Sequence, residues 1–352
     1  MSSSQEFEFC GRMIGEGRPP FIVAEVGFNH GGDVALCRRM IEAAAQNGAD
    51  AVKLQTFAGE ELYSKKHMGK DPDHPGREIP IYQFFKRYEL SRADYEHLFS
   101  HAGELGVPLF STPFDEASLD MLVALGMPAV KIASPDLTHL GLLKRVAETG
   151  LPVVLSTGMG DEKEIERALS ILKSRGNDRI VLLHCVSNYP SHYEEMNLLC
   201  LEGLRSQFHV PVGLSDHTLD NLSAIVATAL GAVMIEKHFT LDRKLPGADN
   251  AISMQPETLR ELKTATLSVR KILGDGKKII QPSEVPVKKS ARRSLVARID
   301  IEAGTVLTEA MLAVKRPGTG IPPEQMDRVV GRKAKSGIRA EDVIGWEAVA
   351  SD

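Results

Sequence analysis

Eight short apolar segments recur between residues 21 and 239, and each ends on polar residues that could take part in chemistry. They are FIVAEVG (21–27), AVKLQTF (51–57), PLFSTPF (108–114), AVKIAS (129–134), PVVLSTG (152–158), IVLLHCV (180–186), PVGLSDH (211–217) and VMIEKHF (233–239). Segments with helical spacing of apolar residues lie between and after them, at 34–47, 91–106, 115–126, 139–149, 161–175, 197–207, 220–230 and 256–273. Strands and helices would also alternate in a doubly wound open sheet, but eight repeats in about 250 residues favour a closed α/β barrel of parallel strands.

The chain is longer than one average domain, and its pattern changes after residue 273. We expect a barrel domain over 1–273, an aperiodic linker rich in Pro, Lys and Arg over 274–290, and a small second domain over 291–352. One connection inside the barrel, 58–90, is unusually long. It could be a lid or binding element, or a simple surface insertion.

Charge and composition exclude several classes of protein. The net charge of −5, without a long basic block, argues against nucleic acid or an anionic membrane as partner. The first ten residues lack the features of a signal peptide, and no apolar stretch approaches the ~20 residues that span a bilayer, so we expect a cytoplasmic protein. The spacing of the four cysteines fits neither a disulfide framework nor a thiolate metal site.

In a parallel barrel the carboxyl ends of all strands meet at one mouth, so scattered polar residues share one pocket, which predicts an enzyme. His217 and His238 end successive strands and should lie side by side. Two neutral imidazoles beside a carboxylate suit a divalent first-row cation. The alternative for such a ring is a hydrogen-bonded core role, which we prefer for His184. Glu25, Glu236 and Asp249 are the candidate carboxylates, which could bind the cation, orient one of its ligands or act as a general base.

A second group of strand-end residues suits a small dianion or trianion, because two ammonium groups would lie beside hydroxyls and a glycine N–H. It comprises Lys53, Lys131, Ser134, Ser156, Thr157, Gly158 and Ser187. A strand-end lysine could instead form a Schiff base, or be a structural residue buried against Glu25. Lys131 and Ser134 have opposite parity along the strand, so one of them must act from beyond it. By the same alternation, Asp216 should point away from a pocket that His217 enters.

These strand ends resemble those of the sialic acid synthase family, which includes N-acetylneuraminate synthases and the related legionaminic and pseudaminic acid synthases. The matching segments are AEVGFNHGG (24–32), VKLQTF (52–57), FSTPF (110–114), VKIAS (130–134), LSTGM (155–159), HCVSNYP (184–190), GLSDHT (213–218), IEKHFTLDR (235–243), PGADN (246–250) and VKRPGTG (314–320). The resemblance implies a (β/α)8 TIM barrel followed by a small antifreeze-like (SAF) domain, which caps the partner's barrel in a domain-swapped homodimer.

The resemblance also implies a reaction: metal-assisted condensation of phosphoenolpyruvate with an N-acylhexosamine, N-acetylmannosamine, to a nine-carbon sialic acid and phosphate by C–O cleavage. It implies that His217 and His238 bind the divalent metal, Mn²⁺, with Mg²⁺ or Co²⁺ as alternatives. The phosphoenolpyruvate-binding residues would be Lys53, Thr112, Lys131, Ser134, Ser156, Ser187 and Ser215. The amino-sugar-binding residues would be Gln55, Tyr189, Glu236, Asp249 and, from the partner's small domain, Arg316. The catalytic residues would be Glu25, Gln55 and Glu236, with Glu25 positioning water.

Departures from the family pattern lie on the amino-sugar side. Ser187 stands where some bacterial members have Asn, Ala248 where Pro is commoner, and the segment HPGREIP shows no evident sugar-contacting Asn. A diacetamido hexose, and hence a legionaminic or pseudaminic acid product, is therefore the alternative. An ice-binding or ligand-binding module without catalysis is an alternative of another class, against which the complete set of barrel strand ends argues.

Overall fold

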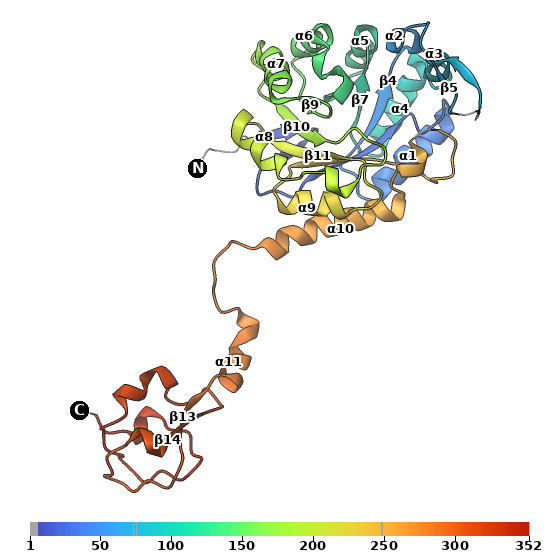
Figure 1. The fold of residues 1–352 in the computed structure, drawn as a ribbon. Helices are drawn as coiled ribbons and strands as arrows, with labels where there is room; N and C mark the ends of the chain where they lie inside the picture. The colour runs from blue at the N-terminus through green and yellow to red at the C-terminus, as the bar shows by residue number, and fades with distance from the viewer. Residues whose placement is uncertain (1–5, 73, 75, 248, 352) are drawn as a thin grey trace. The chain divides into compact units, whose positions relative to one another are not determined.

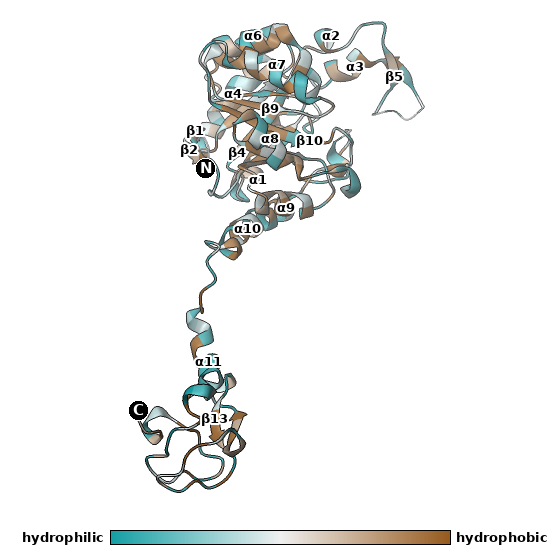
Figure 2. Ribbon diagram, turned by 60° about the vertical axis from the view of Figure 1, so that its left-hand side comes forward, coloured by the Kyte–Doolittle hydropathy of each residue, from teal (hydrophilic) through white to brown (hydrophobic). Residues whose placement is uncertain are grey.

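The computed structural model describes residues 6–72, 74, 76–247 and 249–351 (Figure 1). Eight parallel strands close into a barrel in the order β10-β11-β12-β3-β4-β7-β8-β9, which confirms the barrel and excludes the open sheet. The strands are β3 (Phe21–Gly27), β4 (Ala51–Thr56), β7 (Leu109–Pro113), β8 (Val130–Ile132), β9 (Val153–Ser156), β10 (Ile180–Cys185), β11 (Val212–Asp216) and β12 (Met234–His238). Figure 2 shows the strands as predominantly apolar ribbon at the centre of the first unit.

Helices cover the outside of the barrel at all eight expected places (Figure 1). They are α1 (Val34–Gln46), α4 (Arg92–Glu104), α5 (Glu116–Ala124), α6 (Leu140–Thr149), α7 (Glu162–Lys173), α8 (Cys200–Phe208), α9 (Leu222–Ala229) and α10 (Pro256–Leu273). Local sequence sets their ends: a capping box of Asp161 and Glu164 starts α7, and Gly150 ends α6 in the left-handed region. Their apolar stripes pack on the strands, which is why helical spacing predicts them.

A short amino-terminal hairpin packs at the end of the barrel opposite the mouth. It consists of β1 (Phe7–Phe9) and β2 (Arg12–Ile14). Phe9 is fully buried and makes edge-to-face contacts with Phe21 and Phe110, whose centroids lie 5.2 and 5.8 Å away. Phe21 is the first residue of β3 and Phe110 the second residue of β7, so the hairpin covers the amino-terminal end of the barrel. The sequence reasoning did not predict it.

The close packing of neighbouring strands leaves no room for a side chain at Gly213. A Cβ there would lie 2.3 Å from the Met234 carbonyl oxygen and 2.8 Å from the Leu183 Cδ2. We expect Gly213→Ala to lower the free energy of unfolding by roughly 1–3 kcal/mol in urea denaturation, since backbone must shift. Gly203→Ala in α8 is the control, because nothing lies within 4 Å of that Cβ. It should gain up to about 1 kcal/mol from helix propensity, and equal losses at both positions would contradict the packing argument.

The long connection after β4 has secondary structure and a small core of its own. It contains α2 (Gly59–Leu62), β5 (Met68–Lys70), β6 (Glu78–Pro80) and α3 (Ile81–Lys86). Its core joins two barrel-end rings, Phe28 and Phe57, to Ile79, Phe84 and Tyr88. The described residues of this connection thus form short helices and strands with an apolar core, and a role in covering the mouth stays a prediction.

The chain divides into two compact units, Met1–Gly274 and Asp275–Asp352. The second contains η4 (Pro282–Glu284), α11 (Val285–Ala291), β13 (Ser294–Ala297), η5 (Glu309–Met311), β14 (Leu312–Lys315), η6 (Pro323–Arg328) and η7 (Trp346–Ala348) around its own apolar core. The second half of the expected linker, 274–290, contains secondary structure although its sequence shows no periodicity. There the side chain and backbone of Gln281 and Glu284 form a capping box for η4, and α11 follows directly with a proline in its first turn.

No helix among the described residues is long and apolar enough to cross a lipid bilayer.

Candidate active site

The carboxyl ends of the barrel strands line a cavity of about 370 Å³, measured with its open mouth. Most residues predicted for the site line it: Glu25, Lys53, Gln55, Thr112, Lys131, Ser134, Ser156, Tyr189, Ser215, His217, Glu236 and His238. Ser187 and Asp249 lie beside lining residues: the Ser187 Oγ is 3.8 Å from the Cys185 Sγ, and the Asp249 Oδ2 is 3.7 Å from the His238 Nδ1. The strand ends therefore converge as the barrel pattern predicted.

His217 and His238 lie side by side, with ring centroids 5.5 Å apart. The His217 Nδ1 lies 2.9 Å from the Val186 carbonyl oxygen, and this contact orients the ring. Burial, reinforced by the charge of His217 and nearby lysines, places the pKa of His238 well below its usual value, so this ring is neutral. Burial alone would lower the pKa of His217, but hydrogen bonding to the Cys185 thiol raises it overall.

The donor set fits a divalent cation that keeps open coordination positions. The His238 Nδ1 is buried and has no hydrogen-bond partner within the described residues, so it is free to accept a ligand. No group of three or more His, Cys, Asp or Glu in the described part of the chain is arranged to hold a metal. A cation here would thus be bound by two imidazoles, with water or substrate completing its coordination.

Two buried lysines and two buried glutamates balance charge in the cavity. The Lys53 Nζ lies 2.7 Å from the Glu25 Oε2, and both lysine Nζ atoms lie 3.8 Å from the Glu236 Oε1. The Lys131 Nζ also donates to the Ser156 Oγ at 2.7 Å, and burial lowers the pKa of Lys131. The Glu236 Oε2 is buried without a hydrogen-bond partner in the described residues. A polar ligand in the cavity could satisfy it.

Several hydroxyl groups lie on the Lys131 side of the cavity. Ser134 is the first residue of η1 (Ser134–Thr138), so it acts from beyond β8, which answers the parity question. Its Oγ accepts the Gly158 N–H at 3.0 Å. A Cβ at position 158 would lie 2.3 Å from the Ser187 Oγ, so only glycine lets these groups approach. The Thr157 hydroxyl instead donates to the Leu183 carbonyl oxygen and has a structural role.

A family model described as the NeuB family matches residues 40–278, and a model of the SAF domain matches residues 292–350. The chain belongs to the NeuB family.

Relatives match this NeuB-family chain along nearly its whole length. An uncharacterized protein of Methanocaldococcus jannaschii is 42% identical over 341 residues, which cover 97% of this chain and 98% of that protein. The N,N'-diacetyllegionaminic acid synthase of Legionella pneumophila is 38% identical over 335 residues, 94% of each chain. The crystal structure of N-acetylneuraminic acid synthetase from Leptospira borgpetersenii, in complex with citrate, matches with a TM-score of 0.73 and 38% identity, over 81% of this chain and 95% of that chain. The barrel followed by an SAF domain, expected from the resemblance, is confirmed.

The sequence reasoning missed one polar side chain of the NeuB-family site. Cys185 lines the cavity and is the register partner of Ser215 across the β10–β11 ladder. Its position at a strand end, two residues before Ser187, could have revealed it, but the cysteines were considered only for disulfides and thiolate metal sites. His184 has the core role expected of it, since its Nε2 lies 2.7 Å from the Met196 carbonyl oxygen.

Two predictions cannot be placed in the cavity. Arg316 belongs to the second unit, so its approach to a neighbouring NeuB-family barrel stays a prediction. Ala248 lies outside the described residues.

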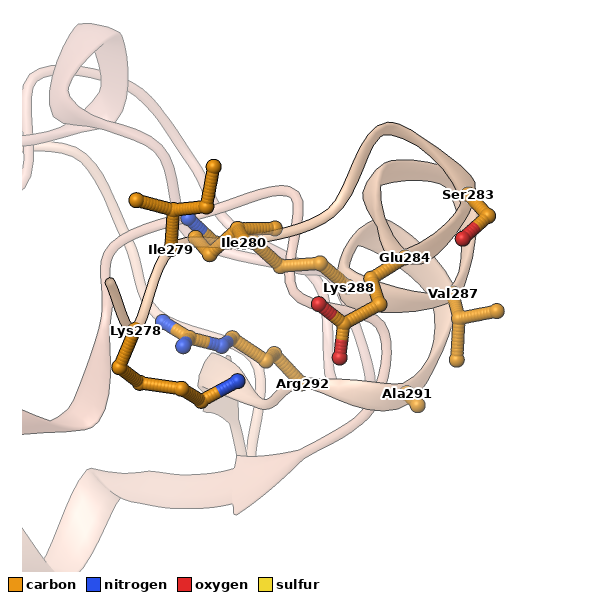
Figure 3. Close-up of a pocket in the computed structure, with 9 residues that line it drawn as sticks. All are labelled: Lys278, Ile279, Ile280, Ser283, Glu284, Val287, Lys288, Ala291 and Arg292. Carbon is orange, nitrogen blue, oxygen red and sulfur yellow. The ribbon is translucent and has the colours of Figure 1, made fainter. Parts of the chain in front are cut away.

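A second hollow lies within the second unit and gathers no comparable chemistry (Figure 3). Exposed Ile279 and Ile280 and the side chains of Lys278 and Arg292 line it. It does not compete with the barrel mouth as the candidate active site.

The buried carboxyl of Glu25 makes stability depend on pH. Burial raises its pKa to about 7, although the neighbouring Lys53 acts in the opposite direction. The folded state therefore retains a proton that the unfolded state loses, and stability should fall as pH rises from about 4.5 to about 7. Glu25→Gln removes this contribution. The free energy of unfolding of the variant, relative to wild type, should rise across that window and level off above it, as urea denaturation at several pH values would show. A constant difference would contradict the assignment.

Proposed function

We propose that the chain condenses phosphoenolpyruvate with an open-chain N-acylhexosamine to form a nine-carbon sialic acid and phosphate, with cleavage of the C–O bond. The observation that carries the proposal is the cavity itself, in which Lys53 and Lys131 lie among hydroxyl groups and a histidine pair occupies the neighbouring strand ends. The names of the relatives from Legionella pneumophila and Leptospira borgpetersenii support it.

The anionic substrate would bind on the lysine side. Lys53 and Lys131 would pair with its carboxylate and phosphate, since ammonium groups with little exposure attract anions strongly. The hydroxyl groups that would complete this part of the site are those of Thr112, Ser134, Ser156, Ser187 and Ser215. Phosphoenolpyruvate would displace the existing contacts of the lysines with Glu25 and Glu236 rather than meet empty charges.

The amino-sugar would bind nearer the mouth, where Tyr189 is half exposed and its ring centroid lies 4.2 Å from the ring centroid of His217. Glu236 and Asp249 would contact its hydroxyl groups. His217 and His238 would hold a divalent ion, with Mn²⁺ as the first candidate and Mg²⁺ or Co²⁺ as alternatives. This ion would supply Lewis-acid polarisation of the sugar aldehyde.

The chain's carboxylates would manage the proton and the water. The π electrons of the C2=C3 bond of phosphoenolpyruvate would form the bond from C3 to the aldehyde carbon, and the aldehyde oxygen would take up a proton to become a hydroxyl group. Water would then add to the cationic C2 and lose a proton, and the C2–O bond to phosphate would break as C2 becomes a ketone carbon. Glu25 is the candidate to hold that water and take its proton, because its pKa of about 7 suits a general base. Gln55 fixes the orientation of Glu25, since the Gln55 Nε2 donates to the Glu25 Oε1 at 2.9 Å.

We propose N-acetylmannosamine as the sugar substrate. A diacetamido hexose is the second candidate, favoured by 38% identity to a protein named a legionaminic acid synthase. The test is to incubate the full chain with phosphoenolpyruvate and a panel of N-acylated hexosamines, with and without chelator, following phosphate release and product mass. Phosphate release that requires both substrates and stops with chelator supports the proposal. An aldol product from pyruvate without phosphoenolpyruvate would contradict it.

We further propose that the chain is a domain-swapped homodimer in which Arg316 reaches the sugar's acyl-amino group in the partner's barrel. Arg316→Ala should then raise KM for the amino-sugar by about tenfold or more, the loss expected when a charged hydrogen bond is removed. KM for phosphoenolpyruvate should change little, as steady-state kinetics would show. Arg339→Ala, at another position in the second unit, is the control. Equal losses for both substrates would count against this role.

A further inference from the structure

A buried ion pair lies directly behind the two histidines. Asp216 and Lys237 are register partners in the β11–β12 ladder, and the Lys237 Nζ lies 2.9 Å from the Asp216 Oδ2. Their side chains are 0% and 1% exposed, and neither lines the cavity. Because side chains alternate along a strand, this pair points away from the side that His217 and His238 enter. The proposed reaction uses neither charge directly.

The contacts of the pair flank His217 in the sequence: Asp216 is the residue before it, and both charged side chains bond to Thr218, the residue after it. The Lys237 Nζ donates to the Thr218 carbonyl oxygen at 2.5 Å, and the Asp216 Oδ1 accepts from the Thr218 N–H at 2.9 Å and its hydroxyl at 2.8 Å. The described ladder between β11 and β12 ends at Asp216 and Lys237, so its bonds do not extend to His217. The side-chain cluster continues the connection between the two strands past the point where the backbone ladder stops.

Stability alone is a weak reason to bury two charges here. Removing them from water is costly, and well-packed apolar side chains of similar size are often equally stable or more so. Directional hydrogen bonds add a fixed geometry, which apolar contacts do not. The two charged residues are the chain neighbours of the two histidines: Asp216 precedes His217, and Lys237 precedes His238. Fixing the side chains of the pair therefore restrains the backbone next to each imidazole.

We propose that Asp216 and Lys237 are positioning residues, which hold the rings of His217 and His238 at the separation that a shared divalent cation needs. The inference rests on the metal site of the proposed function. Groups behind metal ligands commonly fix ring orientation by hydrogen bonds to the ring itself. Here the ion pair would act on the backbone instead, through its hydrogen bonds to Thr218, the residue after His217.

The test measures metal affinity without substrates. Full-length protein is titrated with Mn²⁺, and the electron paramagnetic resonance signal of free Mn²⁺ gives the dissociation constant. Lys237→Met should bind Mn²⁺ about 10- to 100-fold more weakly. Asp216→Asn combined with Lys237→Gln keeps a hydrogen bond without buried charge, and should bind more tightly than Lys237→Met. If Lys237→Met does not fold, the Mn²⁺ affinity of this double variant is compared with wild type instead.

Lys263→Met is the matched control. The Lys263 Nζ pairs with the Asp50 Oδ1 at 2.7 Å, beside the amino-terminal end of β4 and away from the histidines. Its loss should leave Mn²⁺ affinity unchanged. Phosphoenolpyruvate binding without metal should also be unchanged in the Lys237 variants. Folded variants of the pair that bind Mn²⁺ as tightly as this control would overturn the inference.

Failure of the metal site and failure of the inference can be told apart. If wild-type protein binds no Mn²⁺, the metal part of the proposed function is wrong. Nitrogen-15 NMR of the imidazole rings then decides the inference. One sharp set of ring resonances for His217 and His238 in wild type and in Lys263→Met, but several sets in Lys237→Met, would support positioning by the ion pair. The same single set of ring resonances in all three proteins would overturn it.

Discussion

Replacing both His217 and His238 with alanine should lower metal-dependent condensation by about 10³-fold or more. Lewis-acid polarisation contributes several kcal/mol to a transition state, and each 1.36 kcal/mol corresponds to about tenfold in rate. The two imidazoles are the nitrogen donors that lie side by side in the cavity, so no single remaining ring could replace them. Phosphate release at saturating substrates measures the rate, and free Mn²⁺ measures the loss of binding.

His184→Ala is the control for this experiment. His184 is also a histidine of a barrel strand, but its Nε2 contacts the Met196 carbonyl oxygen and it does not line the cavity. This variant should lose stability and keep Mn²⁺ binding. Undiminished turnover in the double alanine variant, or turnover insensitive to chelator in wild type, would reject the metal assignment.

Lys131→Met should raise KM for phosphoenolpyruvate by about 10²-fold or more. Truncating one member of a buried, hydrogen-bonded charge pair costs about 2–5 kcal/mol in binding, and the Lys131 side chain is 3% exposed. It also contacts Glu236 and Ser156, which face the same cavity. Initial rates at varied phosphoenolpyruvate, with the sugar saturating, measure the effect.

Lys144→Met, at an exposed position of α6, is the control and should leave KM unchanged. A separate experiment on wild-type protein tests the Schiff-base alternative. Borohydride with pyruvate should leave the mass of wild-type protein unchanged if the lysines act as ammonium groups. A covalent adduct on Lys131 or Lys53 would favour the aldolase chemistry instead.

The elements that bury one face against the barrel were predictable, because burial imposes a period on the sequence. The strand at 21–27 was predicted with its observed bounds, β3 (Phe21–Gly27). The hairpin β1–β2 was not predicted, since two strands of three residues are too short to show alternation. The helix α11 was missed for another reason: none of its residues is buried, and Val285 and Val287 are 46% and 59% exposed, so no buried face imposes a pattern.

Much of the cavity was also predictable, because the topology of a parallel barrel brings strand ends together whatever their distance in sequence. Contacts between side chains were not. Nothing in the sequence says that Lys53 pairs with Glu25 at 2.7 Å, or that the groups around Gly158 meet so closely. Asp216 could be predicted to point away from the pocket, but its partner Lys237 depends on the register of two strands.

The hairpin that buries Phe9 closes the barrel at one end, so the cavity opens only at the carboxyl ends of the described strands. Among the described residues, aromatic packing occupies the amino-terminal end, while the lysines lie deep, with Lys53 only 3% exposed against 51% for Tyr189 near the rim. If the substrates bind as proposed, the molecule bound at the lysines would have to arrive before the molecule bound near the rim, and could leave only after it.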